Sequence, residues 1–393
     1  MSWEFATSAR ILFGPGARQQ LPGAVRSLGK RPLLTTGRHT ADADVVRALG
    51  AAATFVVEGE PTLDTIRGGV ALFRRERCDV VVGIGGGSAL DAAKAIAALA
   101  ANSGEPLDYL EVIGRGRQLE APAAPCIAVP TTAGTGSEVT RNAVLGSPEH
   151  GLKASLRHAS MLPRLALVDP ELTLTLPAAV TVSTGLDALT QLIEPYVSRR
   201  ATPLTDPWCL DGIRRVSRSL RRAASPAGAS DIDARTDMSL AALFGGLALA
   251  NAGLGVVHGF AAPIGAMFPA PHAAVCAALL PRGMAVNLRA LRARASDHPS
   301  IERYRQVAVA LTGDSTASPD AGVRAVIRLC QDLAVPGLHT YGVSDRHVEE
   351  VCRKARDASS MKANPIELSD DELRAMLMAA LTDLREEIPT VPE

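Results

Sequence analysis

The stretch that decides the fold is Asp79-Val-Val-Val-Gly-Ile-Gly-Gly-Gly-Ser-Ala-Leu-Asp-Ala-Ala-Lys94: an apolar run, consecutive glycines and an alanine-rich segment. The apolar run does not alternate with polar residues, which is typical of a strand covered on both faces of a parallel sheet. Glycines between a strand and a helix let backbone amides approach an anion, and the dipole at the helix start favours negative charge. The stretch therefore predicts a strand–turn–helix unit whose turn, residues 85–88, receives a phosphate.

The same turn has a purely structural interpretation, in which Ser88 and Asp91 form a capping pair on an ordinary helix. It is not a GxGxxG motif, because position 88 is serine, and no Gly-Lys-Ser/Thr follows as in a Walker loop. A second segment favours nucleotide binding. Residues 130–140 follow another predicted strand and concentrate glycines and hydroxyls, which suit ribose and phosphate groups at the carboxyl edge of a parallel sheet. Together the two segments predict a dinucleotide site.

Strand and helix patterns alternate along the chain up to residue 177. Six β-rich runs alternate with stretches of helical spacing, which predicts a parallel sheet with flanking helices. The predicted strands are Arg10 to Phe13, Pro32 to Thr36, Ala53 to Val57, Asp79 to Ile84, Cys126 to Val129 and Leu165 to Val168. The predicted helices between them are Thr62 to Arg75 and Ser88 to Ala101.

Beyond residue 178 the pattern predicts helices separated by Pro- and Gly-containing turns. They are Val180 to Tyr196, Asp206 to Ala223, Ile232 to Ala250, His272 to Arg294, Ile301 to Leu311, Ser318 to Leu333, Asp345 to Ala358 and Asp370 to Leu384. We therefore expect two domains: an α/β dinucleotide-binding domain, residues 1–177, and an all-α domain, residues 178–393.

Composition excludes several other classes of protein. The 393 residues carry 41 Lys and Arg against 41 Asp and Glu, so there is no basic excess of the kind that nucleic-acid binding requires. The six cysteines include no CxxC pair, which favours reduced, buried thiols. The N-terminus lacks the basic-then-apolar order of a signal peptide, and no run of about 18 uncharged apolar residues occurs. We expect a cytoplasmic protein with no membrane partner.

The helical part contains a candidate metal site. Asp187 and Gln191 are four residues apart and so project from one helix face. His258 and His272 are separated by several prolines and glycines, which predicts that they lie near helix ends joined by a tight turn. One carboxylate and two imidazoles are a common set for a catalytic divalent ion. The alternative is a helix cap with two packed histidines.

Taken together, these motifs resemble the iron-containing (group III) alcohol dehydrogenase family, part of the dehydroquinate synthase-like superfamily. The resemblance spans nearly the whole chain and rests on Phe13-Gly-Pro-Gly, Gly85 to Ser88 with Asp91 and Lys94, Pro130 to Glu138, Asp169-Pro170, Gly185 to Glu194, His258 to His272 and Ala363-Asn364-Pro365. It implies metal-assisted hydride transfer between NAD or NADP and an alcohol, or the matching aldehyde or ketone, in a homodimer.

The resemblance also assigns roles to residues. Gly86, Gly87 and Ser88 would hold the pyrophosphate, and Asp187, His258 and His272 would be catalytic through the metal. The full set of candidate cofactor residues is Gly37, Gly85, Gly86, Gly87, Ser88, Asp91, Thr131, Thr132, Thr135, Ser137 and Lys153. The candidate metal ligands are Asp187, Gln191, His258 and His272, for a weakly bound Fe²⁺ or Zn²⁺.

Three residues depart from the family pattern. Gln191 stands where the family usually has a histidine ligand, and a neutral amide is a poorer donor to a transition metal. Ala262 replaces a histidine often assigned to proton relay, so water on the metal or a ribose hydroxyl would carry the proton. Gly37 replaces an aspartate that repels a 2′-phosphate, and with Arg38 and His39 beside it we expect NADPH to be accepted.

Two other functions are kept as alternatives. Maleylacetate reductase-like reduction of an unsaturated oxo-acid fits the overall pattern, but those enzymes often carry asparagine at the position of Asp187. A cofactor-binding protein without catalysis is suggested by Gln191 and Ala262. A dehydroquinate synthase-like lyase is disfavoured by residues 130–138, which match the dehydrogenase pattern.

Overall fold

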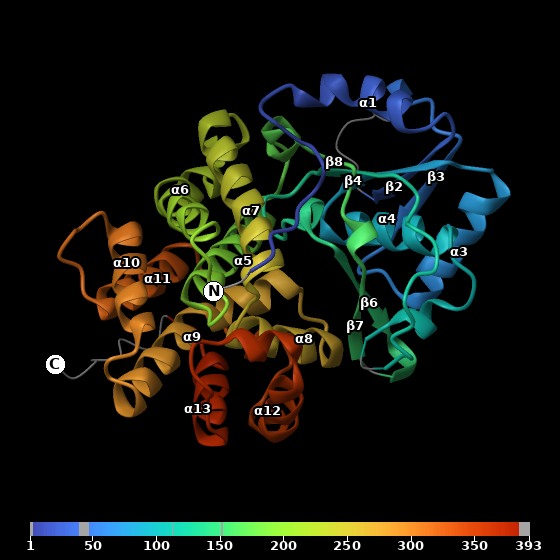
Figure 1. Ribbon diagram of the computed structural model, residues 1–393. Helices are drawn as coiled ribbons and strands as arrows, with labels where there is room; N and C mark the ends of the chain where they lie inside the picture. Colours follow the sequence, from blue (N-terminus) through green and yellow to red (C-terminus); the bar gives the residue numbers. More distant parts are fainter. Residues whose placement is uncertain (1–2, 39–46, 112, 151, 385–393) are drawn as a thin grey trace.

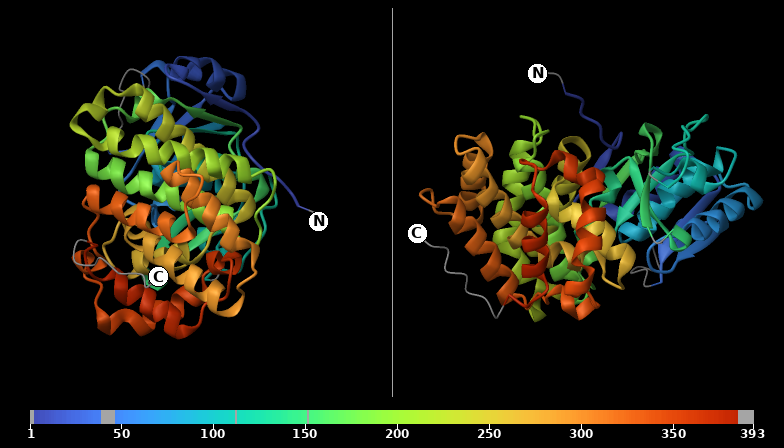
Figure 2. Two further views of the ribbon diagram at one scale, coloured as in Figure 1. Left: turned by 90° about the vertical axis from the view of Figure 1, so that its left-hand side faces the viewer. Right: turned by 90° about the horizontal axis from the view of Figure 1, so that it is seen from below.

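The computed structural model describes residues 3–38, 47–111, 113–150 and 152–384, so His39 lies outside the described part. An α/β half, blue to green in Figure 1, stands beside a helical half, green to red. The views of Figure 2 show the same division. The expected fold class, a parallel sheet with flanking helices followed by helices alone, is confirmed.

The sheet has six strands in the order β1-β8-β5-β4-β2-β3, and every neighbouring pair is parallel. The strands are β1 Ile11–Phe13, β2 Pro32–Gly37, β3 Ala53–Val57, β4 Val80–Gly85, β5 Cys126–Pro130 and β8 Leu165–Val168. These correspond to the six predicted strands. Residues of β2, β4, β5 and β8 are almost all buried, because helices cover both faces of the sheet.

The helices of this half are α1 Leu21–Leu28, α3 Leu63–Arg75 and α4 Gly87–Ala100. α1 was not predicted, because Pro22 and Gly23 interrupt its pattern. A separate antiparallel hairpin pairs β6 Asn142–Ser147 with β7 Leu152–Arg157. α4 crosses the centre of the sheet on a surface made mainly of alanines.

The helices of the other half are α5 Ala178–Val197, α6 Asp206–Ala224, α7 Ile232–Ala252, α8 Val256–Met267, α9 His272–Arg294, α10 Pro299–Thr312, α11 Pro319–Asp332, α12 Val348–Asp357 and α13 Asp370–Ala380. Eight of these were predicted. The exception is α8, whose Gly259, Pro263 and Gly265 hide its helical pattern. α13 ends earlier than predicted, because the chain turns there and Asp383 accepts a hydrogen bond from the Gly337 amide at 2.7 Å.

Helix α9 is long and apolar enough to span a bilayer, yet 83% of its most apolar window is buried inside the protein. That burial is typical of the central helix of a globular fold. Its own residues Leu280, Met284, Leu288 and Leu291 belong to the large apolar cluster that α9 forms with neighbouring helices.

Small residues hold the two halves together. A Cβ added to Gly136 would lie 2.4 Å from the Cα of Gly246 on α7. The loop after β5 and α7 are therefore in direct backbone contact at these two glycines. Gly134 meets α5 in the same way, with its added Cβ 2.7 Å from that of Thr184. Near the N-terminus, the Ala6 amide donates to Asn251 of α7 at 2.7 Å. The loop that follows β5 is therefore fixed against the helical half.

Candidate metal and cofactor site

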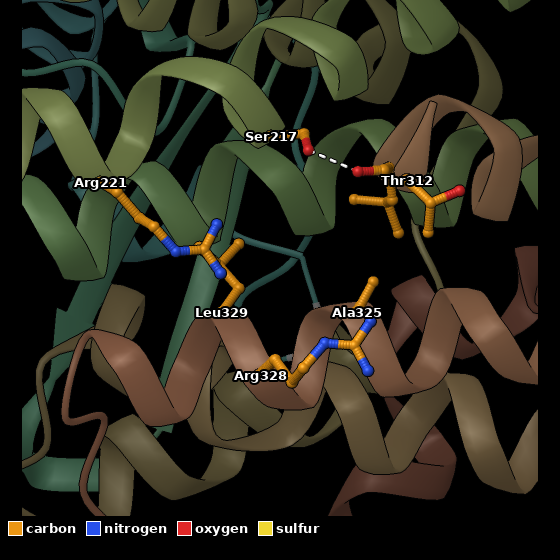
Figure 3. A pocket seen from close by; sticks show the side chains of 7 residues that line it. Ser217, Arg221, Thr312, Ala325, Arg328 and Leu329 are labelled. Atoms are coloured by element: carbon orange, nitrogen blue, oxygen red, sulfur yellow. Dashed lines mark hydrogen bonds between the residues drawn. The ribbon is translucent and has the colours of Figure 1, made fainter. Parts of the chain in front are cut away.

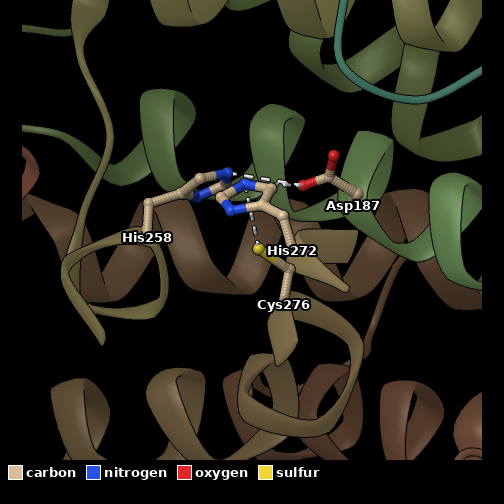
Figure 4. Close-up of side chains that lie close together, drawn as sticks. All are labelled: Asp187, His258, His272 and Cys276. Carbon is tan, nitrogen blue, oxygen red and sulfur yellow. Dashed lines mark hydrogen bonds and ion pairs between the residues drawn. The ribbon is translucent and has the colours of Figure 1, made fainter. Parts of the chain in front are cut away.

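Three helices of the second half bring a cluster of metal-binding side chains together. Asp187 lies in the middle of α5, His258 in the first turn of α8, and His272 is the first residue of α9. Cys276, one turn further along α9, joins them, and one ligand atom from each of the four lies within 4.8 Å of the others (Figure 4). Each histidine does lie at a helix end, but the spacing prediction is only partly right, because the turn before α9 follows the far end of α8 from His258.

The atoms facing one another are buried donors without hydrogen-bond partners. Asp187 Oδ1 lies 3.4 Å from His258 Nε2 and 4.0 Å from His272 Nε2. Among the described residues, Asp187 Oδ1 and His258 Nε2 have no hydrogen-bond partner, although Asp187 is fully buried and His258 is 5% exposed. Buried polar atoms are rarely left unsatisfied, so this donor set fits a divalent cation.

Glu194 fixes the orientation of His258 and was missed by the sequence reasoning. Its Oε2 lies 2.7 Å from His258 Nδ1, and its Oε1 accepts a hydrogen bond from the Val257 amide at 2.6 Å. Donation from Nδ1 to Glu194 would leave the Nε2 lone pair of His258 for a cation in the cluster. A carboxylate behind a ligating histidine commonly sets its tautomer in metal sites. The sequence signal for Glu194 is its position seven residues after Asp187, which places both carboxylates on the same face of α5.

The electrostatics of the cluster suit a cation. Burial alone would lower the pKa of His258, but the neighbouring Cys276 and the Asp187 and Glu194 carboxylates raise that pKa well above its usual value. Burial likewise opposes the charge of Asp187, yet the two histidines hold the pKa of its carboxyl below the ordinary range. The cluster thus stabilises positive charge. Protons on the histidines carry that charge when no metal is bound, and a metal ion would replace them.

Gln191 adjoins the cluster through its contact with Asp187. Its Nε2 donates to Asp187 Oδ2 at 3.1 Å, which leaves Oδ1 turned toward the histidines. Its buried Oε1 has no hydrogen-bond partner in the described part of the chain, and a side chain at Gly245 of α7 would lie 3.4 Å from it. Ala262, one turn after His258 on α8, is partly buried.

The glycine turn and the hydroxyl-rich loop lie against each other, as their positions after β4 and β5 require. Gly85 pairs with Pro130 across the sheet, and the Thr131 amide donates to the Gly85 carbonyl at 2.9 Å. A side chain at Gly87 would come within 2.8 Å of Thr135, and one at Gly86 within 3.4 Å of Thr132. The turn thus has little room for side chains, as a backbone cradle for phosphate requires.

The capping alternative for this turn is wrong. Gly86 is the N-cap of α4, and it makes no side-chain capping bond. Asp91 points elsewhere: its Oδ1 accepts from Ser137 Oγ at 2.5 Å and its Oδ2 from the Val144 amide at 2.9 Å. Asp91 and Ser137 therefore brace the hydroxyl-rich loop and the hairpin against α4.

Lys94 completes this bracing from a fully buried position. Its Nζ donates to the Ser137 carbonyl at 2.9 Å and to Thr140 Oγ1 at 2.8 Å, and lies 3.1 Å from Asp91 Oδ1. Glu138, the residue after Ser137, is 2% exposed. Burial raises the pKa of the Glu138 carboxyl to about 7 although the Lys94 charge opposes the shift.

We expect the Glu138→Gln variant to lose part of the pH dependence of stability. The folded-state pKa of about 7 exceeds the ordinary 4.5, so between these values the folded protein binds more protons than the unfolded chain. Stability therefore falls as pH rises through this window, by roughly 2–3 kcal/mol between pH 5 and pH 8. Urea denaturation of both proteins across that range measures it. A stability difference that stays constant with pH would contradict the assignment.

The remaining candidate cofactor residues lie around the same edge. Gly37 is the last residue of β2, and its amide nitrogen would lie 3.4 Å from a Cβ added to Gly85 at the end of β4. It therefore borders the point between β2 and β4 at which the strand order reverses, where nucleotides bind in such sheets. Arg38 forms an exposed ion pair with Glu58 at 2.7 Å. Lys153 on β7 pairs with Glu60 and points at α8, where a side chain on Gly265 would lie 2.8 Å from its Nζ.

A surface pocket of about 210 Å³ lies elsewhere, between α6, α10 and α11 (Figure 3). Ser217, Arg221, Thr312 and Arg328 are among its lining residues, and Ser217 Oγ donates to the Leu311 carbonyl at 2.5 Å. None of the candidate cofactor or metal residues lines it. It belongs to the packing of the helical half.

Comparisons with known proteins agree with this geometry. The family model for iron-containing alcohol dehydrogenase matches residues 8–170, and that for the C-terminal part of the Fe-containing alcohol dehydrogenase family matches residues 181–381. Long-chain-alcohol dehydrogenase 1 of Geobacillus thermodenitrificans is 36% identical, over 95% of this chain and 96% of its own. NAD-dependent methanol dehydrogenase of Bacillus methanolicus is 32% identical, over 94% and 97%. A crystal structure of 1,3-propanediol oxidoreductase superposes with a TM-score of 0.87 at 32% identity, covering 97% of this chain and 100% of that one.

The fold and the site define an oxidoreductase that acts on alcohols. The chain belongs to the iron-containing alcohol dehydrogenase family, whose members use NAD and a divalent metal. The resemblance inferred from its motifs is thereby confirmed.

Proposed function

We propose that this enzyme interconverts small aliphatic alcohols and aldehydes, with the metal held by Asp187, His258 and His272. The observation that carries the proposal is the pair of buried atoms Asp187 Oδ1 and His258 Nε2, which face each other at 3.4 Å beside His272 and have no hydrogen-bond partner within the described residues. The His272 side chain is 39% exposed, so the cluster has one side open to a substrate. When bound, the metal supplies Lewis acidity toward the substrate oxygen.

The chain's own residues would divide the remaining tasks. Amides at residues 86–88 and the dipole of α4 would bind the cofactor diphosphate, with Thr131, Thr132 and Thr135 beside them. Glu194 would hold His258 in its tautomer, and Gln191 would hold Asp187. Because Gly134 contacts Thr184, one turn before Asp187, the loop after β5 sets the distance between the cofactor and the metal.

We further propose that residues 1–177 and 178–393 act as cofactor-binding and metal-binding domains, and that the enzyme is a cytoplasmic homodimer. Support for the domains comes from the start of α5 at Ala178. Support for a dimer comes from the family resemblance and from β3, an edge strand on which Val56 is 47% exposed.

The test is turnover by chelator-treated protein reloaded with Zn²⁺ or Fe²⁺, with NADH and NADPH and a panel of short aldehydes, diols and oxo-acids. Metal-dependent aldehyde reduction is the expected result. Turnover of unsaturated oxo-acids alone would favour the maleylacetate reductase alternative. Cofactor binding without turnover of any substrate would favour a non-catalytic member.

The Gly37→Asp variant is expected to discriminate against NADPH. Within the described part of the chain, no heavy atom lies within 4 Å of an added Cβ at Gly37, so the side chain fits. A carboxylate there would repel a 2′-phosphate and accept the ribose hydroxyls of NADH. We expect kcat/KM for NADPH to fall roughly tenfold or more, an effect of about 1.4 kcal/mol, with little loss for NADH. Gly23→Asp, an equally unobstructed site on α1, is the matched control. Equal losses with both cofactors would contradict this placement of the ribose.

A further inference from the structure

Cys276 belongs to the cluster although it is not one of the ligands that the sequence predicts. It follows His272 by four residues on α9 and therefore lies on the same helix face. It is fully buried, and its Sγ lies 3.7 Å from His272 Nε2. Figure 4 shows the sulfur directed at the two imidazoles and the Asp187 carboxylate.

The spacing of the donor atoms matches a tetrahedral ion. Zinc bonds of about 2.0–2.3 Å place neighbouring ligand atoms of a tetrahedron roughly 3.3–3.6 Å apart. The measured separations are 3.4 Å from Asp187 Oδ1 to His258 Nε2, 4.0 Å from Asp187 Oδ1 to His272 Nε2, and 3.7 Å from Cys276 Sγ to His272 Nε2. The other separations among the four donor atoms lie below 4.8 Å, so the side chains must move inward to hold an ion. Gln191 is anchored to Asp187 through its amide nitrogen, and its amide oxygen is a neutral, weaker donor than a thiolate.

We propose that Cys276 is the fourth protein ligand of this site and that its thiolate makes the site selective for Zn²⁺ over Fe²⁺. The proposal rests on the metal site proposed above. On binding, the S–H bond of Cys276 breaks, its proton passes to solvent, and a sulfur–metal bond forms. One carboxylate and one thiolate neutralise the dication. Most nitrogen, oxygen and sulfur donor sets bind Zn²⁺ more tightly than Fe²⁺, and a soft thiolate widens that preference. The partly exposed side of His272 would leave room for the substrate beside the site.

X-ray absorption at the zinc edge of the wild-type protein tests this without any variant. We expect one sulfur neighbour at about 2.3 Å and nitrogen or oxygen neighbours at about 2.0–2.1 Å. A first shell of nitrogen and oxygen alone would overturn the proposal. Because this measurement does not depend on turnover, a sulfur neighbour in an inactive protein would contradict the proposed function only, and active protein without sulfur would contradict the ligand only.

Cys276→Ser provides a second readout, with Cys209→Ser as the matched control because Cys209 is also fully buried but lies on α6. The Co²⁺-loaded wild type and Cys209→Ser proteins should show a thiolate-to-metal charge-transfer band in the near ultraviolet, and Cys276→Ser should lack it. Chelator competition should show a loss of Zn²⁺ affinity of roughly 100-fold in Cys276→Ser, with a smaller loss for Fe²⁺. A band that persists in Cys276→Ser, or unchanged Zn²⁺ affinity, would overturn the proposal.

Discussion

Turnover is expected to fall by a factor of about 10³ or more when His258 or His272 is replaced with alanine, because each change removes a metal ligand. A Lewis acid contributes several kcal/mol of charge stabilisation in the transition state, and about 1.4 kcal/mol corresponds to each factor of ten. His258→Ala should have the further effect of leaving the buried Glu194 without its partner. Metal content after gel filtration and kcat with saturating aldehyde measure the two consequences.

Two further variants separate metal chemistry from general damage. Glu194→Gln keeps all ligands but loses the carboxylate that orients His258, so we expect an intermediate loss of roughly 10- to 100-fold in metal affinity or activity. His339→Ala, at an exposed histidine bonded to the Leu381 carbonyl, should leave both unchanged. Normal turnover in folded His258→Ala and His272→Ala proteins would end the metal proposal.

Lys94→Met should lower the free energy of unfolding by about 3–5 kcal/mol, the usual effect of removing one partner from a buried ion pair. The Lys94 side chain is fully buried and its ammonium serves Asp91, the Ser137 carbonyl and Thr140. Methionine fills similar volume but removes the charged donor that these three oxygens share. Since native proteins are stable by only about 5–15 kcal/mol, this is a large fraction. Urea denaturation at neutral pH is the measurement.

The matched control is Lys354→Met, which removes a partly exposed ion pair to Glu350 at 3.0 Å on α12. Exposed pairs of this kind contribute at most about 1 kcal/mol, so this variant should remain close to the wild type. Lys94→Met should in addition raise KM for the cofactor, because the loop around Ser137 loses its anchor. Similar stabilities for the two variants would show that Lys94 does not brace the loop.

The sequence predicts the sheet well because each buried strand is a short β-rich run that stands out from its surroundings. The sequence pattern fails to predict a helix where the helix contains Gly and Pro residues. α8 is the clearest case: Gly259 lies against Met361, and a Cβ there would come within 2.7 Å of that side chain. The glycines and the proline inside α8 have low helix propensity, and this is what hides the helix from its own pattern.

The candidate site is predicted less completely. Asp187, His258 and His272 are found because carboxylates and imidazoles stand out as ligands, and the structure brings them together. Cys276 was interpreted as one of six buried thiols, and the structure does show all six unpaired and buried. What distinguishes Cys276 is the position of α9 relative to α5 and α8. That placement depends on tertiary packing, which spacing along one helix does not reveal.

The most direct test is a crystal structure of the protein grown with Zn²⁺ and NAD, with anomalous scattering recorded at the zinc edge. We predict one peak per chain, bonded to Asp187, His258 and His272, with the cofactor diphosphate on the amides of residues 86–88. A zinc peak away from those three side chains, or a diphosphate bound elsewhere, would contradict the proposed site.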